Sequence, residues 1–338
     1  MSGPRIAVIT FTDDLHALLV RDRLREQYPG TRCEIVETDT LADTRPGPSW
    51  STDPGHFPHT VPVRGNGTVD PASLDLIWHR RWNRPQRAAD ALADPAVQET
   101  VNAATSSALL GTLYAGFRGT WVSDPEATRR AENKILQLEA ARTAGLAVPA
   151  TLISQDPPAI RKFHEDHAAS GIVLKALRST PRSQLFTLPV TQEMLADDEA
   201  LRLCPSIFQQ YVPGSVHIRA LCLDTEVHAV TVDSPELDWR RNLDVPVHHG
   251  DLPPHVRRAL ARVLELLGLR MGVADLKIDQ STGEAVWLEL NPQGQFLFVE
   301  GLTGIDLTGI FAAFLHREAV QAQHRKPDTA PLATMPLW

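Results

Sequence analysis

The segment 271–295, MGVADLKIDQSTGEAVWLELNPQGQ, constrains the fold of this chain more than any other stretch. Two runs of alternating apolar residues, 273–278 and 285–290, flank a polar turn that contains Gly283. Apolar alternation on both sides of such a turn is typical of a β-hairpin. We therefore predict two paired antiparallel strands in this segment.

The predicted hairpin carries three side chains with hard oxygen atoms. Because side chains alternate between faces along a strand, Glu289 is expected to share a face with Trp287 and Asn291. Asp275, on the first strand, is expected to come level with Glu289 and Asn291 across the pair. Two carboxylates and an amide around one point suit Mg²⁺. Water and phosphate oxygens would complete its coordination shell. The alternative is a surface hairpin whose acids are structural.

Composition narrows the class of protein. A chain of 338 residues is long enough for two or three packed units, and 43% hydrophobic and 22% charged residues are ordinary for a globular protein. The net charge of −8 argues against nucleic-acid binding, which needs clustered Lys and Arg. The sequence shows neither a signal core nor an apolar run of membrane length, so we expect no membrane partner. Cys33, Cys204 and Cys222 are odd in number and widely spaced, as in a reduced cytoplasmic protein.

The N-terminal part predicts a parallel sheet. Residues 5–10 form a buried-strand pattern, residues 15–28 a helical pattern and residues 33–37 a second strand. Neither GxGxxG nor the P-loop pattern GxxxxGK followed by Ser or Thr occurs, so dinucleotide and P-loop sites have no support. Residues 43–59 are rich in Pro, Gly and Ser and are predicted to form a long loop.

A further strand, predicted over residues 74–82, contains the pair Arg80 and Arg81. A buried strand that leads into two arginines would present them to an anionic substrate at the carboxyl edge of the sheet. Two solvated arginines at a strand end explain the pattern equally well. A long helix is predicted over residues 95–117, and we expect a domain boundary near Thr120.

One helix is predicted to follow that boundary. Ser123 or Asp124 is a good N-cap, and Pro125 suits the first turn. The apolar period then continues through Lys134 to Gly145, where glycine ends the helix. A single lysine on such a helix is usually solvated, so Lys134 acquires meaning only from its sequence context.

Two strands come next. Residues 170–176 form a buried-strand pattern that one charge, Lys175, interrupts. An ammonium group in such a run is costly unless it meets an anion. Residues 206–212 form the next strand, which taken alone is an interior strand, and its last four residues are Gln209, Gln210, Tyr211 and Val212.

The C-terminal part begins with a predicted hairpin over residues 215–232, which carries His217 and Arg219. Arg240 follows in the segment LDWRRN, where its guanidinium is a candidate anchor for a carboxylate or a phosphate. An amphipathic helix is predicted over residues 253–267, and a final helix begins near Asp306.

Taken in order, these features resemble the ATP-grasp ligase superfamily, most clearly in the strings KILQLEAARTAGLAVP and WLELNPQG. The resemblance covers nearly half of the chain. It implies that Lys134 reaches a nucleotide phosphate and that Lys175 touches the α-phosphate and the adenine edge. It also implies that the 206–212 hinge reads adenine through its backbone. It also implies that Arg219 contacts the γ-phosphate and the developing acyl phosphate. The implied Mg²⁺ ligands are Asp275, Glu289 and Asn291.

Two features depart from the superfamily pattern. No glycine-rich loop follows Lys175, where the segment LRSTPRSQLF offers Arg178, Arg182 and hydroxyl groups instead. These side chains would have to cover the phosphates in place of the glycine-rich loop. His217 stands where an acidic residue is common.

Within the superfamily, the string LELNPQGQFLFVEGLTGIDLT and the segments IWHRRW and DWR look most like graspetide (microviridin-type) synthetases, which mature ribosomal peptides. The resemblance implies an α/β and α+β ATP-grasp fold. It divides the chain into an N-terminal pre-ATP-grasp parallel-sheet domain (1–119), a central subdomain (120–205), a C-terminal subdomain with the metal site (206–325) and a loose tail (326–338).

The implied function is that of an ADP-forming ligase that uses ATP and Mg²⁺. It would activate Asp or Glu side chains of a precursor peptide, composed of a leader and an acidic core, as acyl phosphates. Ser or Thr hydroxyls, or Lys amines, would then attack, so ester and amide products both stay open. Arg219 and Arg240 would be catalytic, Arg80 and Arg81 would bind substrate, and a homodimer is expected.

Three questions stay open at this stage. Either His217 or Asp275 would accept the proton of the attacking group. One alternative function is a ligase that acts on free amino acids or adds glutamate to a C-terminus through the same nucleotide site. The other is a nucleotide-binding module without catalytic activity, in which the acids of the hairpin are structural.

Overall fold

The computed structural model describes residues 3–44, 46–82, 84–178, 186–242 and 244–325. The chain divides into two compact units. The first comprises residues 1–126 and 306–338, and the second comprises residues 127–305. The subdivision at residues 119, 205 and 325 that the sequence suggests stays a prediction.

A four-stranded parallel sheet forms the middle layer of the first unit, in the order β2-β1-β5-β6. Its strands are β1 (Arg5–Thr10), β2 (Arg32–Glu37), β5 (Leu76–His79) and β6 (Thr120–Val122). Helix α1 (Leu15–Gln27) connects β1 to β2, so the predicted β-α-β opening and parallel sheet are confirmed. The predicted strand over residues 74–82 is shorter in the structure, and Arg80 follows its end.

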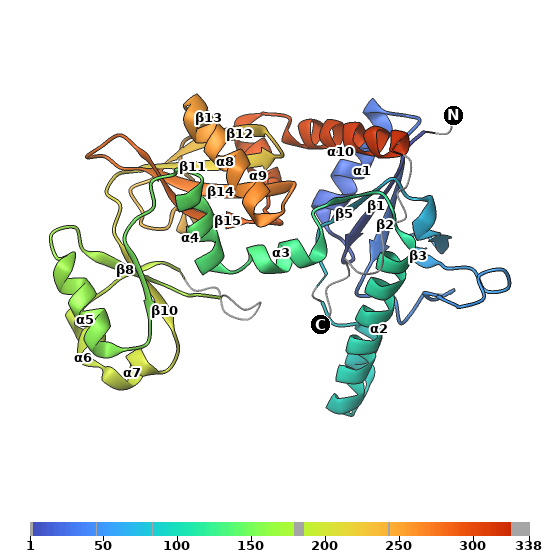
Figure 1. The fold of residues 1–338 in the computed structure, drawn as a ribbon, viewed down its shortest axis with the longest axis horizontal. Helices are drawn as coiled ribbons and strands as arrows, with labels where there is room; N and C mark the ends of the chain where they lie inside the picture. The colour runs from blue at the N-terminus through green and yellow to red at the C-terminus, as the bar shows by residue number, and fades with distance from the viewer. Residues whose placement is uncertain (1–2, 45, 83, 179–185, 243, 326–338) are drawn as a thin grey trace. The chain divides into compact units, whose positions relative to one another are not determined.

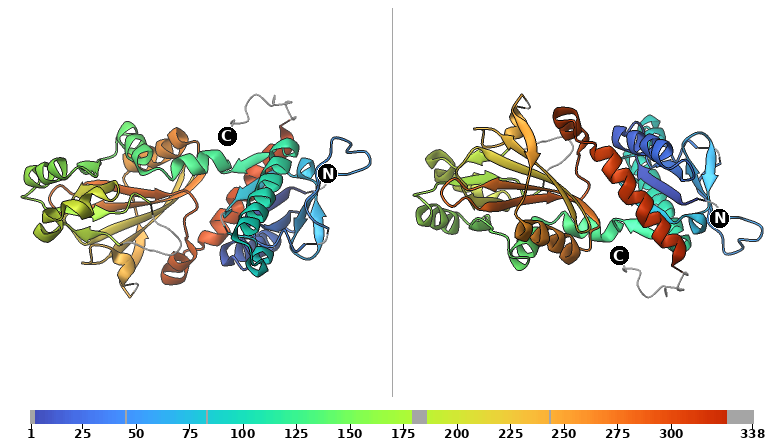
Figure 2. Two further views of the ribbon diagram at one scale, coloured as in Figure 1. Left: turned by 90° about the horizontal axis from the view of Figure 1, so that it is seen from below. Right: turned by 90° about the horizontal axis from the view of Figure 1, so that it is seen from above.

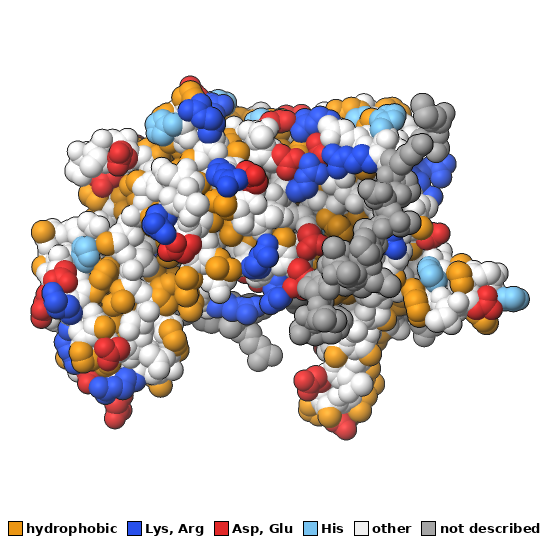
Figure 3. Space-filling model, in the orientation of Figure 1, with side chains coloured by type: hydrophobic (Ala, Val, Ile, Leu, Met, Phe, Trp, Pro, Cys, Tyr) orange, Lys and Arg blue, Asp and Glu red, His pale blue; other side chains and the backbone are white. Residues whose placement is uncertain are grey.

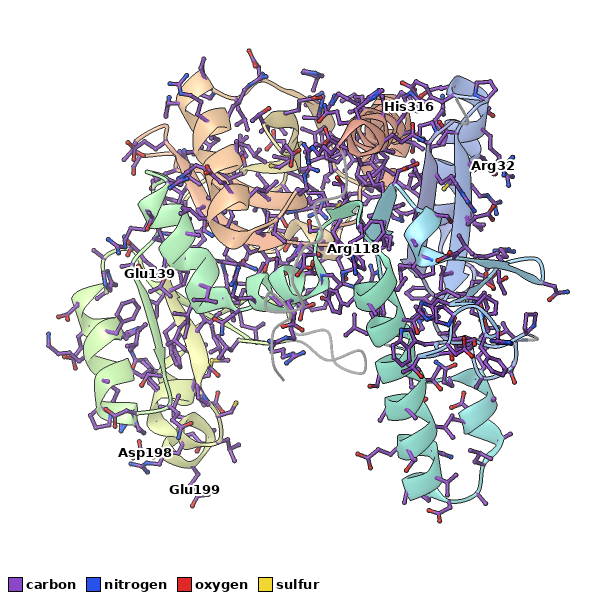
Figure 4. All side chains as sticks on the ribbon, turned by 45° about the vertical axis from the view of Figure 1, so that its right-hand side comes forward. Arg32, Arg118, Glu139, Asp198, Glu199 and His316 are labelled. Carbon is purple, nitrogen blue, oxygen red and sulfur yellow. The ribbon has the colours of Figure 1, made fainter. Side chains whose placement is uncertain are left out.

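Helices cover both faces of this sheet (Figure 1). On one face, Ala7, Ile9 and Ile77 pack with Leu109 and Leu113 of α2 (Pro95–Gly116). Arg118, labelled in Figure 4, donates to the carbonyls of the last turn of α2 and so ends that helix. Short strands β3 (Val61–Val63) and β4 (Gly67–Val69) pair as a small hairpin beside the same core.

The last helix that the structure describes, α10 (Leu307–His324), belongs to the first unit. It runs beside the N-terminal strands in both views of Figure 2, where it is drawn in red. The rings of Phe311 and Trp78 form a T-shaped pair with 4.8 Å between centroids, and His316 stacks on Tyr28 at 3.9 Å (Figure 4). Although residues 127–305 separate it from the rest of the unit in the sequence, α10 therefore completes the core on this face of the sheet.

The second unit contains two antiparallel sheets, in the orders β7-β10-β8-β9 and β13-β12-β11-β14-β15. The first sheet consists of β7 (Thr151–Ser154), β8 (Ile172–Lys175), β9 (Leu188–Pro189) and β10 (Ser206–Gln210). The second consists of β11 (Val216–Leu223), β12 (Glu226–Asp233), β13 (Val247–Gly250), β14 (Met271–Ile278) and β15 (Ala285–Asn291). Both hairpins predicted in this half, 215–232 and 273–290, are confirmed.

Helices pack on one face of each of these sheets. Helices α4 (Lys134–Thr143) and α8 (Pro254–Leu267) bury their apolar sides on the five-stranded sheet, whose core includes Ala220, Leu276 and Trp287. Helix α5 (Pro157–Asp166) packs on the four-stranded sheet through Ile160, together with α6 (Gln192–Ala196) and α7 (Asp198–Arg202). The remaining elements are η1 (Pro71–Ser73), η2 (Arg87–Ala91), α3 (Pro125–Ala131), η3 (Trp239–Arg241) and α9 (Leu297–Thr303). The opposite face of the five-stranded sheet carries the polar side chains considered below.

The prediction of a single helix between Pro125 and Gly145 was wrong, because the first helix, α3, ends at Ala131 and a second, α4, begins at Lys134. Asn133 lies in the extended conformation and its side chain accepts hydrogen bonds from the amides of Ile135 and Leu136, at 2.9 and 3.3 Å. An asparagine in this role is an N-cap. Lys134 is therefore the first residue of α4 rather than a residue in the middle of a long helix.

A bulge in β15 corrects the predicted side-chain faces of the hairpin. Asp275 pairs with Glu289, but the next residue, Leu276, pairs with Trp287, so Leu288 has no partner on β14. An extra residue shifts the alternation by one position. Trp287 consequently faces the helices, whereas Glu289 faces away from them. The prediction that Glu289 and Trp287 share a face was wrong, and the strand pairing places Glu289 opposite Asp275 as expected.

In the described ranges, no helix combines the length and the apolar content that crossing a lipid bilayer requires.

Trp287 is fully buried in the core between the five-stranded sheet and its helices. We expect Trp287→Ala to lower the free energy of unfolding by about 3–5 kcal/mol, because it leaves a large cavity. Trp287→Phe should cost clearly less, since the indole nitrogen finds no hydrogen-bond partner among the described residues. Leu203→Ala, at a side chain that is 82% exposed, is the control and should change stability by under about 0.5 kcal/mol. Urea unfolding measures all three, and a small effect of Trp287→Ala would contradict this packing.

Candidate active site

Three charged side chains lie in one row across three adjacent strands of the five-stranded sheet. Arg219 on β11 pairs with Asp275 on β14, and Asp275 pairs with Glu289 on β15. Nη1 of Arg219 donates to both oxygens of Asp275, at 2.8 and 2.9 Å, and its Nη2 donates to the carbonyl of Gln295 at 3.0 Å. Asn291 pairs with Val273, two residues along β14 from Asp275, and so lies on the same face.

Cations from two other elements surround the carboxylate of Glu289. Nζ of Lys134 donates to Oε2 at 2.7 Å, and Nη1 of Arg240 lies 3.8 Å from Oε1. Burial alone would raise the pKa of Glu289, but Lys134, Arg240 and Lys175 outweigh it and lower the pKa to about 2. Glu289 is therefore ionised at neutral pH. For Asp275, burial is the larger effect and raises the pKa despite the contact with Arg219.

Gln137 fixes α4 against β15 beside this carboxylate. Its Nε2 donates to the carbonyls of Ala131 and Leu290, at 2.7 and 2.8 Å, and its Oε1 accepts from the amide of Leu290 at 2.9 Å. The side chain is 1% exposed. These bonds set the position of Lys134 relative to Glu289, a role that sequence reasoning did not assign although Gln137 lies in the string that carries the resemblance.

Lys175 is the last residue of β8, and its ammonium lies close enough to Glu289 to interact with it electrostatically. Its Nζ donates to Oε1 of Gln209 at 2.6 Å, and Nε2 of Gln209 donates to Thr151 at 2.9 Å. Burial is the main cause that lowers the pKa of Lys175 to about 8; Lys134 and Arg240 lower it further, while Glu289 opposes them. Lys175, Lys134 and Arg240 thus all interact electrostatically with Glu289.

Arg240 is held in place by Asp238, which sequence reasoning had not singled out. Nε and Nη2 of Arg240 donate to the two carboxylate oxygens of Asp238, at 2.8 and 2.6 Å. The η3 turn makes this pair possible, because Asp238 caps it and brings residues two apart onto one side. Burial works to raise the pKa of Asp238, but its bonds with Arg240 prevail and lower it. The rings of Trp239 and Phe298 flank Arg219, at 6.0 and 5.3 Å from Cζ to the ring centroids.

The segment 206–212 lies at the centre of the four-stranded sheet up to Gln210, because β10 pairs with β7 on one side and β8 on the other. The amide of Gln210 donates to the carbonyl of Ala150 at 2.8 Å, and the amide of Tyr211 donates to Gly171 at 3.0 Å. Val212 is buried. These two amides are therefore engaged within the protein.

His217 and Lys277 face each other one step along the sheet from the charged row. Both are 3% exposed, and Nζ of Lys277 lies 5.0 Å from the ring centroid of Tyr211. Burial, and then Lys277, lower the pKa of His217 to about 4, so it is neutral at pH 7. The two candidate proton acceptors, His217 and Asp275, thus lie on the same face. Lys277 was not predicted, although the strand alternation from Asp275 would have indicated its face.

Arg80 and Arg81 lie in the first unit, after β5. Arg80 is 1% exposed and its Nε lies 3.4 Å from Oδ2 of Asp14, which caps α1. Burial lowers the pKa of Arg80 to about 10. Solvated arginines were one explanation of this pair, and Arg80 does not fit it. Arg178 is exposed and lies 3.9 Å from Glu132, whereas Arg182 is outside the described residues.

The donor set of the second unit fits a divalent cation and a polyphosphate. No group of three or more His, Cys, Asp or Glu side chains that could hold a metal ion occurs in the part of the chain that the structure describes. Asp275, Glu289 and Asn291 instead offer two carboxylates and an amide from one face of paired strands, the oxygen donors that Mg²⁺ prefers. Around them, four cations face three carboxylates, so the cluster has a positive charge left for an anion.

The sequence matches no protein-family model and no curated protein sequence. Among solved structures, it is similar to the macrocyclase MdnC from Microcystis aeruginosa MRC, with a TM-score of 0.80 and 24% identity over 92% of this chain and 99% of that one. A RiPP-associated ATP-grasp ligase from Chryseobacterium gregarium gives 0.79 and 20%, over 92% and 96%. The ATP-grasp ligase PsnB gives 0.72 and 23%, over 93% and 98%.

The chain has the ATP-grasp fold. The predicted fold class, α/β and α+β with an N-terminal parallel sheet, is confirmed. At identities below 25% the likeness establishes the architecture, and the chemistry of this chain must be argued from its own side chains.

The buried ammonium of Lys175 makes stability depend on pH in a defined direction. Its folded pKa of about 8 lies below the ordinary value of 10.5, so the unfolded chain binds more protons between these values and stability rises with pH there. Lys175→Met removes this dependence. We expect the stability of the variant relative to the wild type to be highest near pH 7 and to fall as pH approaches 10.5. Urea unfolding at pH 7.5 and 10 tests this, and a difference that does not change with pH would count against it.

Proposed function

We propose that this protein is an ATP-dependent peptide macrocyclase of the graspetide type. The observation that carries the proposal is the row Arg219–Asp275–Glu289, flanked by Lys134 and Arg240, on one face of the second unit. Such a row supplies oxygen ligands for a metal and cations for a phosphoryl group side by side, which phosphoryl transfer requires.

The structures that this fold resembles support the proposal. MdnC is a macrocyclase bound with its precursor peptide MdnA, and the Chryseobacterium ligase is in complex with ADP and a leader and core peptide. PsnB is complexed with a minimal precursor, Mg and ADP. We infer that this chain likewise uses ATP and Mg²⁺ and acts on a ribosomal precursor peptide with a leader and an acidic core.

In this proposal, the second unit holds the nucleotide. Lys134 and Lys175 bind its phosphates, and the segment from Gln209 to Val212 lies along the adenine. Asp275, Glu289 and Asn291 would hold Mg²⁺, which when bound neutralises phosphate charge. Lys134 and Arg219, which now contact the two carboxylates, would be released toward the phosphate oxygens.

The reaction has two steps. A carboxylate oxygen of an Asp or Glu side chain in the peptide forms a bond to the γ-phosphorus, and the bond to the departing ADP breaks. A hydroxyl or amine of the same peptide then attacks the acyl carbon, its proton passes to His217 or Asp275, and phosphate leaves. Arg219 stabilises the charge on the transferring group, and Arg240, oriented by Asp238, anchors the substrate carboxylate. We also propose Arg80 and Arg81 as peptide-binding residues.

Incubation with ATP, Mg²⁺ and a peptide rich in Asp or Glu and Ser or Thr tests this function by mass spectrometry. A macrocyclase removes one water per bond formed and releases one ADP. A mass gain of one amino acid would instead support a ligase that extends its substrate. ATP that stays intact with every peptide would favour a nucleotide-binding module without catalytic activity.

Variants of the proposed Mg²⁺ ligands sharpen the test. We expect Glu289→Gln and Asn291→Ala to lower ADP formation by about 10²-fold or more, because the first removes the negative charge of a ligand of the cation and the second removes a ligand altogether. Glu284→Gln, at an exposed acid on the same hairpin, is the matched control and should leave the rate unchanged. Near-normal turnover of Glu289→Gln, with intact circular dichroism, would refute the metal assignment.

We further propose a homodimer in the cytoplasm. Helix α2 supports the first part, because it has one charged side chain, Glu99, in 22 residues and buries few of its apolar ones. The part of it that is visible in Figure 3 is white and orange, with red only toward its lower end. The three cysteines support the second part, since all of them are free thiols. Light scattering should give a mass of about twice 37.2 kDa, and a monomer at micromolar concentration would contradict the dimer.

A further inference from the structure

Lys277 is a buried lysine to which the proposed reaction gives no role. Its side chain is 3% exposed, and its ammonium lies over the ring of Tyr211 at 5.0 Å. In the described part of the chain, no carboxylate pairs with this ammonium and no oxygen accepts a hydrogen bond from it. The residue opposite it, His217, is neutral at pH 7 and supplies no counter-charge. Burying an ammonium in this way is unfavourable unless a ligand provides acceptors.

The position of Lys277 along β14 indicates which part of a nucleotide it would meet. Asp275, at the proposed metal, precedes it by two residues on the same face, a spacing of roughly 7 Å. Beyond Lys277, the amide of Gln280 donates to the carbonyl of Pro213, just after the hinge, at 2.9 Å. The carbonyl of Ile278 comes so close to Gly214 that a Cβ there would lie 2.7 Å from it. Lys277 thus lies between the end that would hold phosphates and the hinge that would hold the base.

The ribose is the part of ATP between its base and its phosphates. The phosphate end already has Lys134, Lys175, Arg219 and Arg240, whereas the interval next to Tyr211 has Lys277. An ammonium carries three donors and no acceptor, which suits hydroxyl oxygens.

We propose that Lys277 donates hydrogen bonds to the ribose hydroxyls of the nucleotide and makes the site prefer ribonucleotides to deoxyribonucleotides. The inference rests on the proposed use of ATP. It adds a specificity residue at a position whose neighbours serve the metal and the base.

Calorimetric titration of the full chain with Mg²⁺ and ADP, 2′-deoxy-ADP or 3′-deoxy-ADP tests the inference without a peptide. The wild type should bind ADP roughly 10- to 100-fold more tightly than the analogue that lacks the bonded hydroxyl, as expected for a hydrogen bond from a charged donor. Lys277→Met should bind ADP about as weakly as that analogue, so that the preference falls to about one. A preference of the same size in both proteins would overturn the inference.

Two controls separate a ribose contact from other roles. Lys175→Met should weaken all three nucleotides alike and keep the wild-type preference, because it acts on a phosphate. Lys277→Gln keeps a donor and should retain part of the preference. If Lys277→Met also weakened all three alike, Lys277 would be a phosphate ligand and the inference would be wrong.

Thermal unfolding distinguishes a ligand contact from a structural one. Removing an unneutralised buried ammonium should leave the melting temperature of Lys277→Met equal to or above that of the wild type. Suppose that Lys277→Met lowers the melting temperature strongly and that Lys277→Gln keeps the full wild-type preference for the hydroxyl. Lys277 would then have a structural role, and the inference would be wrong. A wild type that binds none of the nucleotides overturns the proposed function itself, whereas one that binds them without discrimination overturns this inference alone.

Discussion

The neutralisation of two neighbouring carboxylates is the constraint on which the second unit depends. Asp275 and Glu289 lie directly opposite each other on paired strands, where their negative charges repel. Arg219 binds both oxygens of the first, and Lys134 binds the second. These cations come from a third strand and from a helix, so the row is electrostatically acceptable only once the sheet and α4 have assembled. In the proposed function, a metal and a phosphate would replace these internal partners.

Helix α4 contributes more than the charge of Lys134. Because the break at Asn133 places Lys134 in the first turn, the positive end of the helix dipole also lies near Glu289. Gln137, with three buried hydrogen bonds, ties that turn to β15. The position of Lys134 is therefore fixed by the backbone of α4 and by Gln137, rather than by its own long side chain. Preorganisation of this kind is what electrostatic catalysis uses.

Local patterns in the sequence predicted the elements well, because strands and amphipathic helices follow short-range periodicity. They failed where a bulge, a turn or a helix break interrupts the regular period. The bulge at Leu288 has no glycine to announce it, and it arises from how β15 must present Trp287 to the core and Glu289 to the opposite face. The pairing of Asp238 with Arg240 required the η3 turn, which the segment did not reveal. The break before α4 did have a signal, since Asn133 is a good cap, but the longer apolar period concealed it.

The place of α10 in the chain bears on how the protein is made. The first unit needs Phe311 against Trp78, yet these residues stand at opposite ends of the coding order, with the whole second unit inserted between them. During synthesis one face of the parallel sheet must stay uncovered until α10 has left the ribosome. The continuous stretch 127–305 faces no such delay and is free to fold beforehand. A truncation that removes α10 would therefore destabilise the first unit more than the second.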